Sequence, residues 1–524
     1  MSFLKLLILV SFSAFVAAFS FFISMKKSAA NHFEIFNNNY TDTVKSGRQL
    51  AEQYCSGCHL FPEPALLDKK TWVNHVLPNM GFRLGIYEEG KDPYANLPPE
   101  EEKIMRQLGI YPELPLLSKE NWRKIVSYYE KDSPAEPHPQ KSTDPFFNEL
   151  IQFKATAIDI EKKPLPRTTL LKFDKVTSQI YVGDAQNLLY ALDGNFQLKN
   201  KLITESPPTD IDFPKNGLPR VLTIGIFNPS DQKLGRLHTL DKLTDTIPSR
   251  MNIPRLPRPV QFATAALNLD GKEDVVVCGF GNNTGKLMWF DDFQPTKEHV
   301  LKALPGAIRV EIADLNRDKK PDIVVLMAQS WEGVSVFYNL GNGKFKEKKV
   351  LQLPAVYGVS YFELVDFNKD GFQDILLTNG DNWDLSRIRK NYHGIRLYLN
   401  DKKDNFKEAF FYPLYGATKA VARDFDGDGD LDIAAISFYN DFEKPEQGFV
   451  YLSNTGGGNF KTFITPLAAD GKWLTMETGD FDQDGDIDIV LGSYFHNVAE
   501  LSKLVFRGVT VFPQLLLLTN QKKN

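Results

Sequence analysis

The chain has 524 residues, of which 42% are hydrophobic and 24% are charged, and its formal net charge is −5 at pH 7. This composition excludes a disordered chain, and the length exceeds what one compact core usually holds, so we expect two or more domains. The lack of a net positive charge argues against a nucleic-acid partner.

Residues 1–30 are predicted to form a signal peptide or a membrane anchor. The run from Leu6 to Ile23 has no charged residue and is flanked by lysines. Such a run is typical of a secretory leader, and the small residues at positions 16–18 offer a cleavage site. It is also long enough for an uncleaved spanning helix. Both alternatives predict an exported protein that is periplasmic or anchored to the membrane facing the periplasm.

The chain has only three cysteines, and two of them lie in one short motif. Residues 55–59 read Cys-Ser-Gly-Cys-His, the attachment pattern of c-type haem, in which two thiols bond the haem and the next residue ligates its iron. A redox dithiol needs no His directly after it, and a zinc site needs two more ligands at short spacing. We therefore predict one covalent haem c, bound by Cys55, Cys58 and His59. Cys278 lies in an apolar run and is predicted to be buried.

A methionine is the expected sixth ligand of the haem iron. Met80 lies in a stretch that Pro78 and Gly81 predict to be a loop, and such a position suits a distal thioether. Met105 lies in a helical pattern, where methionine more often fills the core. We favour Met80, and the alternatives are Met105, His75 or an open position. A Met/His pair raises the haem potential and favours electron transfer.

A helix is predicted to close this first domain. Ser118 is a suitable N-cap, and Trp122, Ile125, Val126 and Tyr129 recur on one helical face. With the haem motif and the segment 72–85, residues 46–132 resemble a small class I cytochrome c domain, in a variant that bacterial proteins fuse to propeller repeats. The resemblance implies a small all-α cytochrome c domain.

A proline-rich linker is predicted at residues 133–150, and acidic repeats follow it. Each repeat carries oxygen-bearing side chains at positions one, three, five and nine, and then an apolar strand. A first, incomplete copy starts at residue 266. The other copies contain Asp314, Asn316, Asp318 and Asp322; Asp366, Asn368, Asp370 and Asp374; Asp424, Asp426, Asp428 and Asp432; and Asp480, Asp482, Asp484 and Asp488.

Between the acidic loops, a second piece recurs as a strand, a glycine or asparagine turn, and a strand that restarts at a phenylalanine. Each repeat thus holds about four strands, which is the content of one propeller blade. We therefore predict an all-β propeller of about seven blades over residues 151–524, with its first repeat near 155–207. The repeats resemble FG-GAP and VCBS-type repeats, as in integrin-like propellers, and that resemblance implies calcium binding.

The loop chemistry is consistent with calcium. Oxygen ligands at alternate positions of a tight loop, with glycine at position six, suit a hard cation. An EF-hand is rejected, because position twelve is a strand residue rather than Glu. Turns without metal are the alternative reading, but clustered carboxylates repel one another unless a cation neutralises them. We predict about three Ca²⁺ ions, in the loops at 366, 424 and 480, and a further one in the loop at 314.

Two functions remain open. The first is an electron carrier whose haem serves a periplasmic or membrane redox protein, with the propeller as a platform for docking or for a carbohydrate or protein ligand. The second is a propeller enzyme, an oxidoreductase or a carbohydrate-active protein, that passes electrons to the haem. The sequence has no nucleophile elbow, dinucleotide-binding glycine loop or zinc-protease motif, which favours the carrier. A polar insertion at residues 381–393 is predicted either to rim a central site or to be an extended loop.

Overall fold

The computed structural model describes residues 45–141, 150–161, 163, 165–215, 217–240, 249–381 and 388–521. The predicted leader or anchor lies outside these residues, as does most of the second half of the linker. Among the helices that are described, none combines the length and apolar character needed to cross a membrane.

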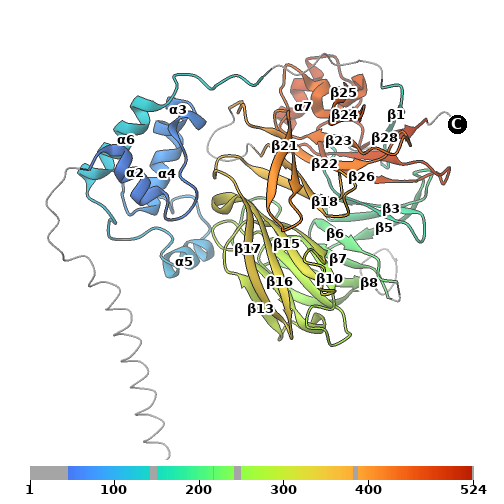
Figure 1. Cartoon of the computed structure of the whole chain (residues 1–524), viewed down its shortest axis with the longest axis horizontal. Helices are drawn as coiled ribbons and strands as arrows, with labels where there is room; N and C mark the ends of the chain where they lie inside the picture. Colours follow the sequence, from blue (N-terminus) through green and yellow to red (C-terminus); the bar gives the residue numbers. More distant parts are fainter. Residues whose placement is uncertain are drawn as a thin grey trace, which may run out of the picture.

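The N-terminal domain is helical and is built around one apolar core (Figure 1). Its elements are α2 (Gly47–Cys55), η2 (Pro64–Leu66), α3 (Lys69–Thr71), η3 (Trp72–Val76), α4 (Leu77–Arg83), α5 (Pro99–Gln107) and α6 (Lys119–Asp132). The predicted closing helix is confirmed as α6: the Ser118 hydroxyl accepts the Asn121 N–H at 3.2 Å, and Trp122, Ile125 and Tyr129 are buried. Helix α2 lies so close to α6 that a Cβ on Gly47 would come within 2.2 Å of the Lys124 carbonyl oxygen.

One local prediction in this domain is wrong. Met80 was expected in a loop, but Leu77–Arg83 is helical. The helical backbone is continuous from Lys69 to Arg83, and Pro78 follows directly on the π-helical turn η3, whose last bond runs from the Leu77 N–H to the Trp72 carbonyl oxygen. Gly81 is needed for packing rather than for a turn, because a Cβ there would lie 3.2 Å from the Trp122 ring.

The C-terminal domain is a seven-bladed propeller of four-stranded antiparallel sheets, as predicted. From the central axis outward, the blades are β2 (Thr168–Asp174), β3 (Gln179–Asp184), β4 (Leu188–Leu192) and β5 (Leu198–Ile203); β6 (Pro208–Asp212), β7 (Arg220–Thr223), β8 (Gly235–Leu240) and β9 (Ser249–Leu256); β10 (Pro259–Ala265), β11 (Asp274–Gly279), β12 (Lys286–Phe290) and β13 (Glu298–Lys302); β14 (Ala307–Ala313), β15 (Asp322–Met327), β16 (Gly333–Gly341) and β17 (Lys344–Gln352); β18 (Val359–Val365), β19 (Asp374–Asn379), β20 (Gly394–Asn400) and β21 (Phe406–Pro413); β22 (Ala417–Arg423), β23 (Asp432–Ser437), β24 (Phe449–Asn454) and β25 (Phe460–Phe463); and β26 (Trp473–Gly479), β27 (Asp488–Ser493), β28 (Leu515–Asn520) and β1 (Phe153–Ile158).

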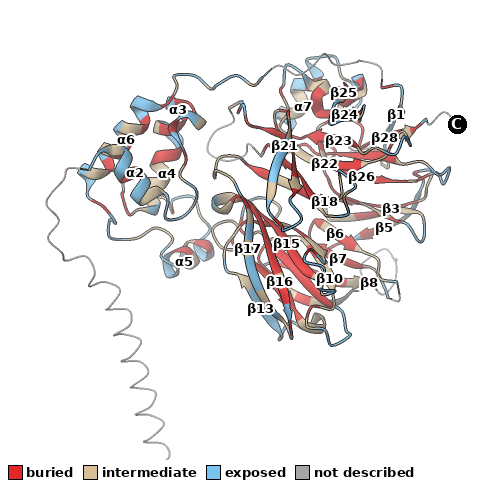
Figure 2. Cartoon of the chain, viewed as in Figure 1, coloured by how far each residue is buried: buried red, intermediate tan, exposed pale blue. Residues whose placement is uncertain are grey.

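Burial is highest in the second strand of the blades and lowest in the outer strand (Figure 2). The second strands β11, β15, β19, β23 and β27 are buried at every residue, whereas the outer strand β13 is largely exposed. A strand that is covered on both faces by neighbouring blades must be apolar throughout, which explains the continuous apolar runs after the acidic loops. Cys278 lies on β11 and is fully buried, as predicted.

The ring closes differently from the prediction. Strand β1 was expected in the first repeat, but it pairs with β28 of the last blade, with Phe153 opposite Asn520 and Ile158 opposite Leu515. The N-terminal strand of the propeller thus completes the C-terminal blade. This pairing covers an edge that would otherwise be open.

The ends of the strands define two faces of the propeller. Loops from the first to the second strand of each blade, which include the acidic loops, lie on one face, which we call the acidic-loop face. Because the strands are antiparallel, loops from the second to the third strand lie on the opposite face, as do the connections between blades. We call this second face the docking face.

His238 is predicted to make stability depend on pH. It is buried on β8, and neither ring nitrogen has a hydrogen-bond partner among the described residues. Burial lowers its pKa below the usual 6.5, so the unfolded chain takes up a proton that the folded protein does not. The contribution of neutral His238 to the free energy of unfolding is therefore complete above pH 6.5. Below pH 6.5 that free energy falls by up to about 1.4 kcal/mol per pH unit.

The variant His238→Phe tests this linkage. Between pH 7 and pH 5 we expect its melting temperature to fall less than that of the unaltered protein, because the proton-linked part has been removed. Parallel curves for the two proteins would show that His238 carries none of the pH dependence.

Candidate functional site

The predicted haem-attachment residues lie at the end of α2. Cys55 is the last residue of that helix, and both Cys55 and Cys58 are free thiols. Burial raises the pKa of the Cys55 thiol to about 11, so it is protonated at neutral pH. The His59 ring places Nδ1 2.8 Å from the Leu60 carbonyl oxygen. With Nδ1 donating this bond, Nε2 carries the lone pair that a metal ligand needs.

The candidate sixth ligands lie in different environments. Met80, on α4, is partly buried and packs against the same apolar core as Cys55. Met105, on α5, is buried, and its Sδ accepts a hydrogen bond from Asn283 Nδ2 of the propeller at 3.6 Å. His75 is exposed. The thioether of Met105 therefore has a role in the domain contact.

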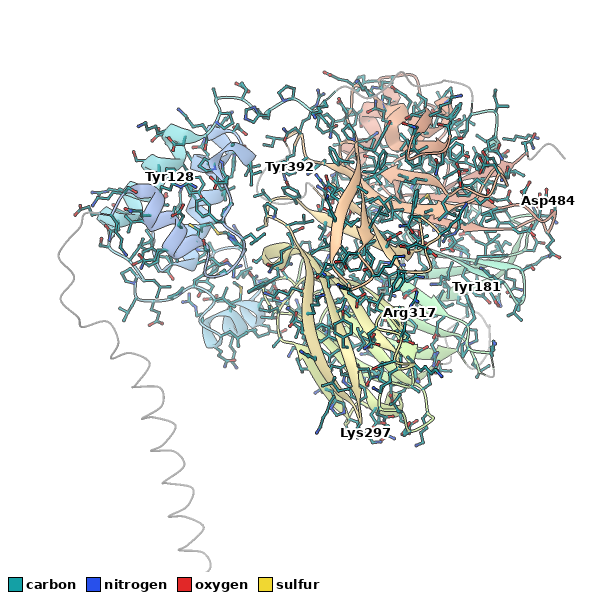
Figure 3. The ribbon with its side chains drawn as sticks, viewed as in Figure 1. Tyr128, Tyr181, Lys297, Arg317, Tyr392 and Asp484 are labelled. Carbon is teal, nitrogen blue, oxygen red and sulfur yellow. The ribbon has the colours of Figure 1, made fainter. Side chains whose placement is uncertain are left out.

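The helical domain lies against the docking face of the propeller (Figure 1). Ser230 donates a hydrogen bond to the buried Glu101 carboxylate at 2.6 Å. Arg83 Nη2 donates to Asn283 Oδ1 at 2.7 Å. Val356 and Ile388 of the propeller add apolar contact to the helical core. In Figure 3, Tyr392 lies on the side of the propeller that faces the helical domain, and Asp484 lies at the opposite edge.

A cavity of about 600 Å³ occupies the centre of the propeller and is lined by the first strands of all seven blades. Its size lies within the range of small-molecule sites. The lining includes the cations of Lys172, Arg309, Lys419 and Arg423, and the acids of Asp210, Glu363 and Glu477. Charges of both signs thus line the cavity.

Most of these charges have partners within the propeller. Arg423 Nη1 donates to Glu363 Oε1 at 2.7 Å, and Lys172 lies 3.6 Å from Asp210. Lys419 Nζ instead donates to a backbone group, the Met476 carbonyl oxygen, at 2.6 Å. Burial lowers the pKa of Lys419 to about 8. Its ammonium is therefore more ready to lose a proton than an ordinary lysine.

Two acidic loops bring their carboxylates together. In the loop at 424, oxygen atoms of Asp424, Asp426 and Asp428 lie within 4.8 Å of one another, and the loop at 480 repeats the arrangement with Asp480, Asp482 and Asp484. Asp424 Oδ1 and Asp480 Oδ1 are buried and have no hydrogen-bond partner among the described residues. A buried carboxylate oxygen without a donor is costly, and a bound cation would satisfy it. Both loops fit a calcium ion.

The loops at 366 and 314 differ at the first position. Both carboxylate oxygens of Asp366 accept backbone N–H groups, from Asp370 and Gly371. Asp314 is satisfied in the same way by the N–H groups of Asp318 and Lys319. At position three, where the loops at 424 and 480 have Asp, these two loops have Asn368 and Asn316. Position five keeps its acid in both loops, as Asp370 and Asp318. These loops carry less negative charge and are closed by their own backbone.

The aspartates at position nine bridge strands. Asp374 Oδ1 accepts the Asn400 N–H at 2.8 Å and Oδ2 accepts the Phe367 N–H at 3.0 Å. The other members, Asp322, Asp432 and Asp488, accept the equivalent two N–H groups and are also buried. They lie outside the two carboxylate clusters. Each therefore ties its loop to the third strand of the blade, and their assignment as calcium ligands stays a prediction.

The polar insertion at 381–393 is described only at its ends. Asp381 borders the central cavity, which agrees with the prediction that the insertion rims a central site. Tyr392 stacks on Tyr357 with ring centroids 4.5 Å apart, and His393 is buried. Residues 382–387, which include Trp383, lie outside the described residues.

Three stretches of the chain, residues 267–325, 314–377 and 424–491, match the model of the FG-GAP-like repeat. The chain therefore carries FG-GAP-like repeats within its seven-bladed propeller. No curated protein matches the chain. Among solved structures, the Pan2 WD40 domain of Neurospora crassa is 11% identical with a TM-score of 0.43, over 72% of this chain and 99% of that one. Sqt1 of Saccharomyces cerevisiae is 10% identical with a TM-score of 0.40, over 68% and 84% of the two chains.

Proposed function

We propose that the chain is an exported c-type haem protein that transfers electrons, with its calcium-binding propeller as the platform for a partner. The observation that carries this proposal is the motif at residues 55–59, with two free thiols at the end of α2 and a histidine whose Nε2 is left available. Bound haem would supply a one-electron redox centre. The helical domain would then be a cytochrome c domain.

The residues of the helical domain would each have one task. Cys55 and Cys58 would hold the haem covalently, and His59 would ligate the iron, oriented by its bond to the Leu60 carbonyl. Met80 is the preferred sixth ligand, because the Met105 sulfur is already engaged by Asn283. In the propeller, Asp424, Asp426 and Asp428 would hold one calcium ion and Asp480, Asp482 and Asp484 another.

A propeller enzyme is the second candidate, and the central cavity favours it. A cavity of about 600 Å³ that is lined by ionisable groups can hold a small polar substrate. In that case an oxidoreductase or carbohydrate-active propeller would pass electrons to the haem. The partner is a periplasmic or membrane redox protein under the first candidate, and a small molecule such as a sugar under the second.

The test is to produce the full chain with c-haem maturation and to follow the haem spectrum of the oxidised protein. A covalent haem that survives denaturation is expected, and the Cys55→Ser/Cys58→Ser variant should lack it. Reduction by redox proteins alone supports the carrier, whereas rapid reduction by sugars or alcohols alone supports the enzyme. A preparation without covalent haem would contradict both candidates.

A further inference from the structure

A second cavity lies between the two domains, next to the predicted haem ligand. Its volume is about 140 Å³, and Ser56, His59 and Leu60 form its wall on the helical side. The propeller forms the opposite wall, from strands β15, β16 and β17 and from the short helix η5 (Gln329–Trp331). His59 therefore borders this space on the helical side, opposite the propeller wall.

One aromatic side chain and two lysines give the propeller wall its character. Trp331 is half-buried, and the Lys349 Nζ lies 4.3 Å from the centroid of its ring. The Lys302 Nζ lies 5.8 Å from the same ring and pairs with Glu347. The wall thus combines a flat apolar surface with positive charge, and cation–π contacts hold these groups together.

The turn that carries Trp331 is anchored to the next blade. Glu332 follows η5 directly, and its Oε2 accepts the Val359 N–H at 2.7 Å. Glu332 also borders both cavities, with Gln329 on the central side and Trp331 on the His59 side. A single turn of chain thus separates the two spaces. Because it is fixed by a buried bond, the Trp331 ring is presented to the helical domain in advance.

We propose that the propeller supplies the outer wall of the haem site, with Trp331 covering the haem and Lys349 neutralising a haem carboxylate. This inference rests on the proposed attachment of haem at Cys55 and Cys58. Haem is a flat apolar ring with two carboxylates, and it needs the two properties that this wall combines. The cavity is smaller than the roughly 300 Å³ of a typical ligand site, so it would take only part of the haem, and the rest would lie against the helical domain.

A matched pair of lysine variants tests the electrostatic half. Lys349 borders the cavity and Lys346 does not, although both are exposed on β17 and both lose one charge on replacement by glutamine. A positive charge near haem favours the reduced form, so we expect Lys349→Gln to lower the midpoint potential and Lys346→Gln to leave it unchanged. The titrations use the full haem-bearing chain at low ionic strength, where exposed charges are least screened.

Tryptophan emission tests the aromatic half. Haem quenches the fluorescence of nearby tryptophans. In the haem-free Cys55→Ser/Cys58→Ser protein, Trp331→Phe should therefore reduce the tryptophan emission. In the haem-bearing protein the same change should reduce it hardly at all, because Trp331 is already quenched. Two results together would overturn the inference while haem attachment stands. The first is that the two lysine variants shift the midpoint potential equally or not at all, and the second is that Trp331 still emits in the haem-bearing protein. Loss of covalent haem from the unaltered chain would instead overturn the proposed function.

Discussion

We expect that removing calcium with a chelator lowers the melting temperature of the propeller by several degrees. The loops at 424 and 480 each gather three carboxylates, and each leaves a buried oxygen without a donor. An ion that binds only the folded state stabilises it by about 2.7 kcal/mol when present at 100 times its Kd. Two such sites would contribute about 5 kcal/mol, which is a large share of the stability of an ordinary domain.

Calorimetry of the full chain in calcium and in excess chelator measures this effect. The double variant Asp424→Asn/Asp480→Asn should lose most of the response to chelator, because the first ligand of each of these two loops loses its negative charge. Asp366→Asn is the matched control, since both oxygens of Asp366 already accept backbone N–H groups. It should keep the part of the response that comes from the loops at 424 and 480. Identical melting of the unaltered chain in calcium and in chelator would refute structural calcium.

The second large effect concerns the haem iron. In Met80→Leu, we expect the midpoint potential to fall and the iron to bind carbon monoxide readily, because the thioether that favours the reduced state and fills the sixth position is gone. The covalent haem content should not change, since Cys55 and Cys58 remain. Potentiometric titration and carbon monoxide difference spectra provide the measurement.

Met105→Leu is the control for the ligand assignment. Its sulfur accepts a hydrogen bond from Asn283, so its loss should weaken the contact between the domains without opening the iron. If Met105→Leu allowed carbon monoxide to bind the iron and Met80→Leu did not, Met105 would be the sixth ligand in place of Met80. If neither did, the sixth position would belong to another group, such as His75.

The propeller could be predicted because its signal is repeated. Five of the seven blades restate the acidic loop and the buried strand that follows it, so an error in one copy is corrected by the others. What the repeats could not reveal is closure, because β1 has no acidic loop and its partner β28 lies at the other end of the chain. The strand-bridging role of Asp374 and its equivalents was also hidden, because the sequence shows the carboxylate but not the two N–H groups that it accepts.

The proposed haem-attachment motif stands out in the sequence for a different reason: the chemistry of attachment would require five consecutive residues. The placement of the helical domain was not readable, because the contacts that set it are ordinary polar pairs far apart in the chain, such as Glu101 with Ser230 and Arg83 with Asn283. The Met80 segment misled because Pro78 and Gly81 usually mark loops. Here the proline lies within a continuous helical run, directly after its π-helical turn, and the glycine makes room for Trp122.

The pairing of β1 with β28 has a consequence for how the protein is made. A ring that is closed by strands from the two ends of the domain cannot be completed until the last residues have been synthesised, and contacts this distant in sequence form slowly. The haem-attachment motif needs no such wait, because it is local and precedes the propeller. We therefore expect maturation in two stages, in which an early truncated chain can already carry haem while its blades remain open. Loss of the last ten residues should leave a coloured protein that is sensitive to protease.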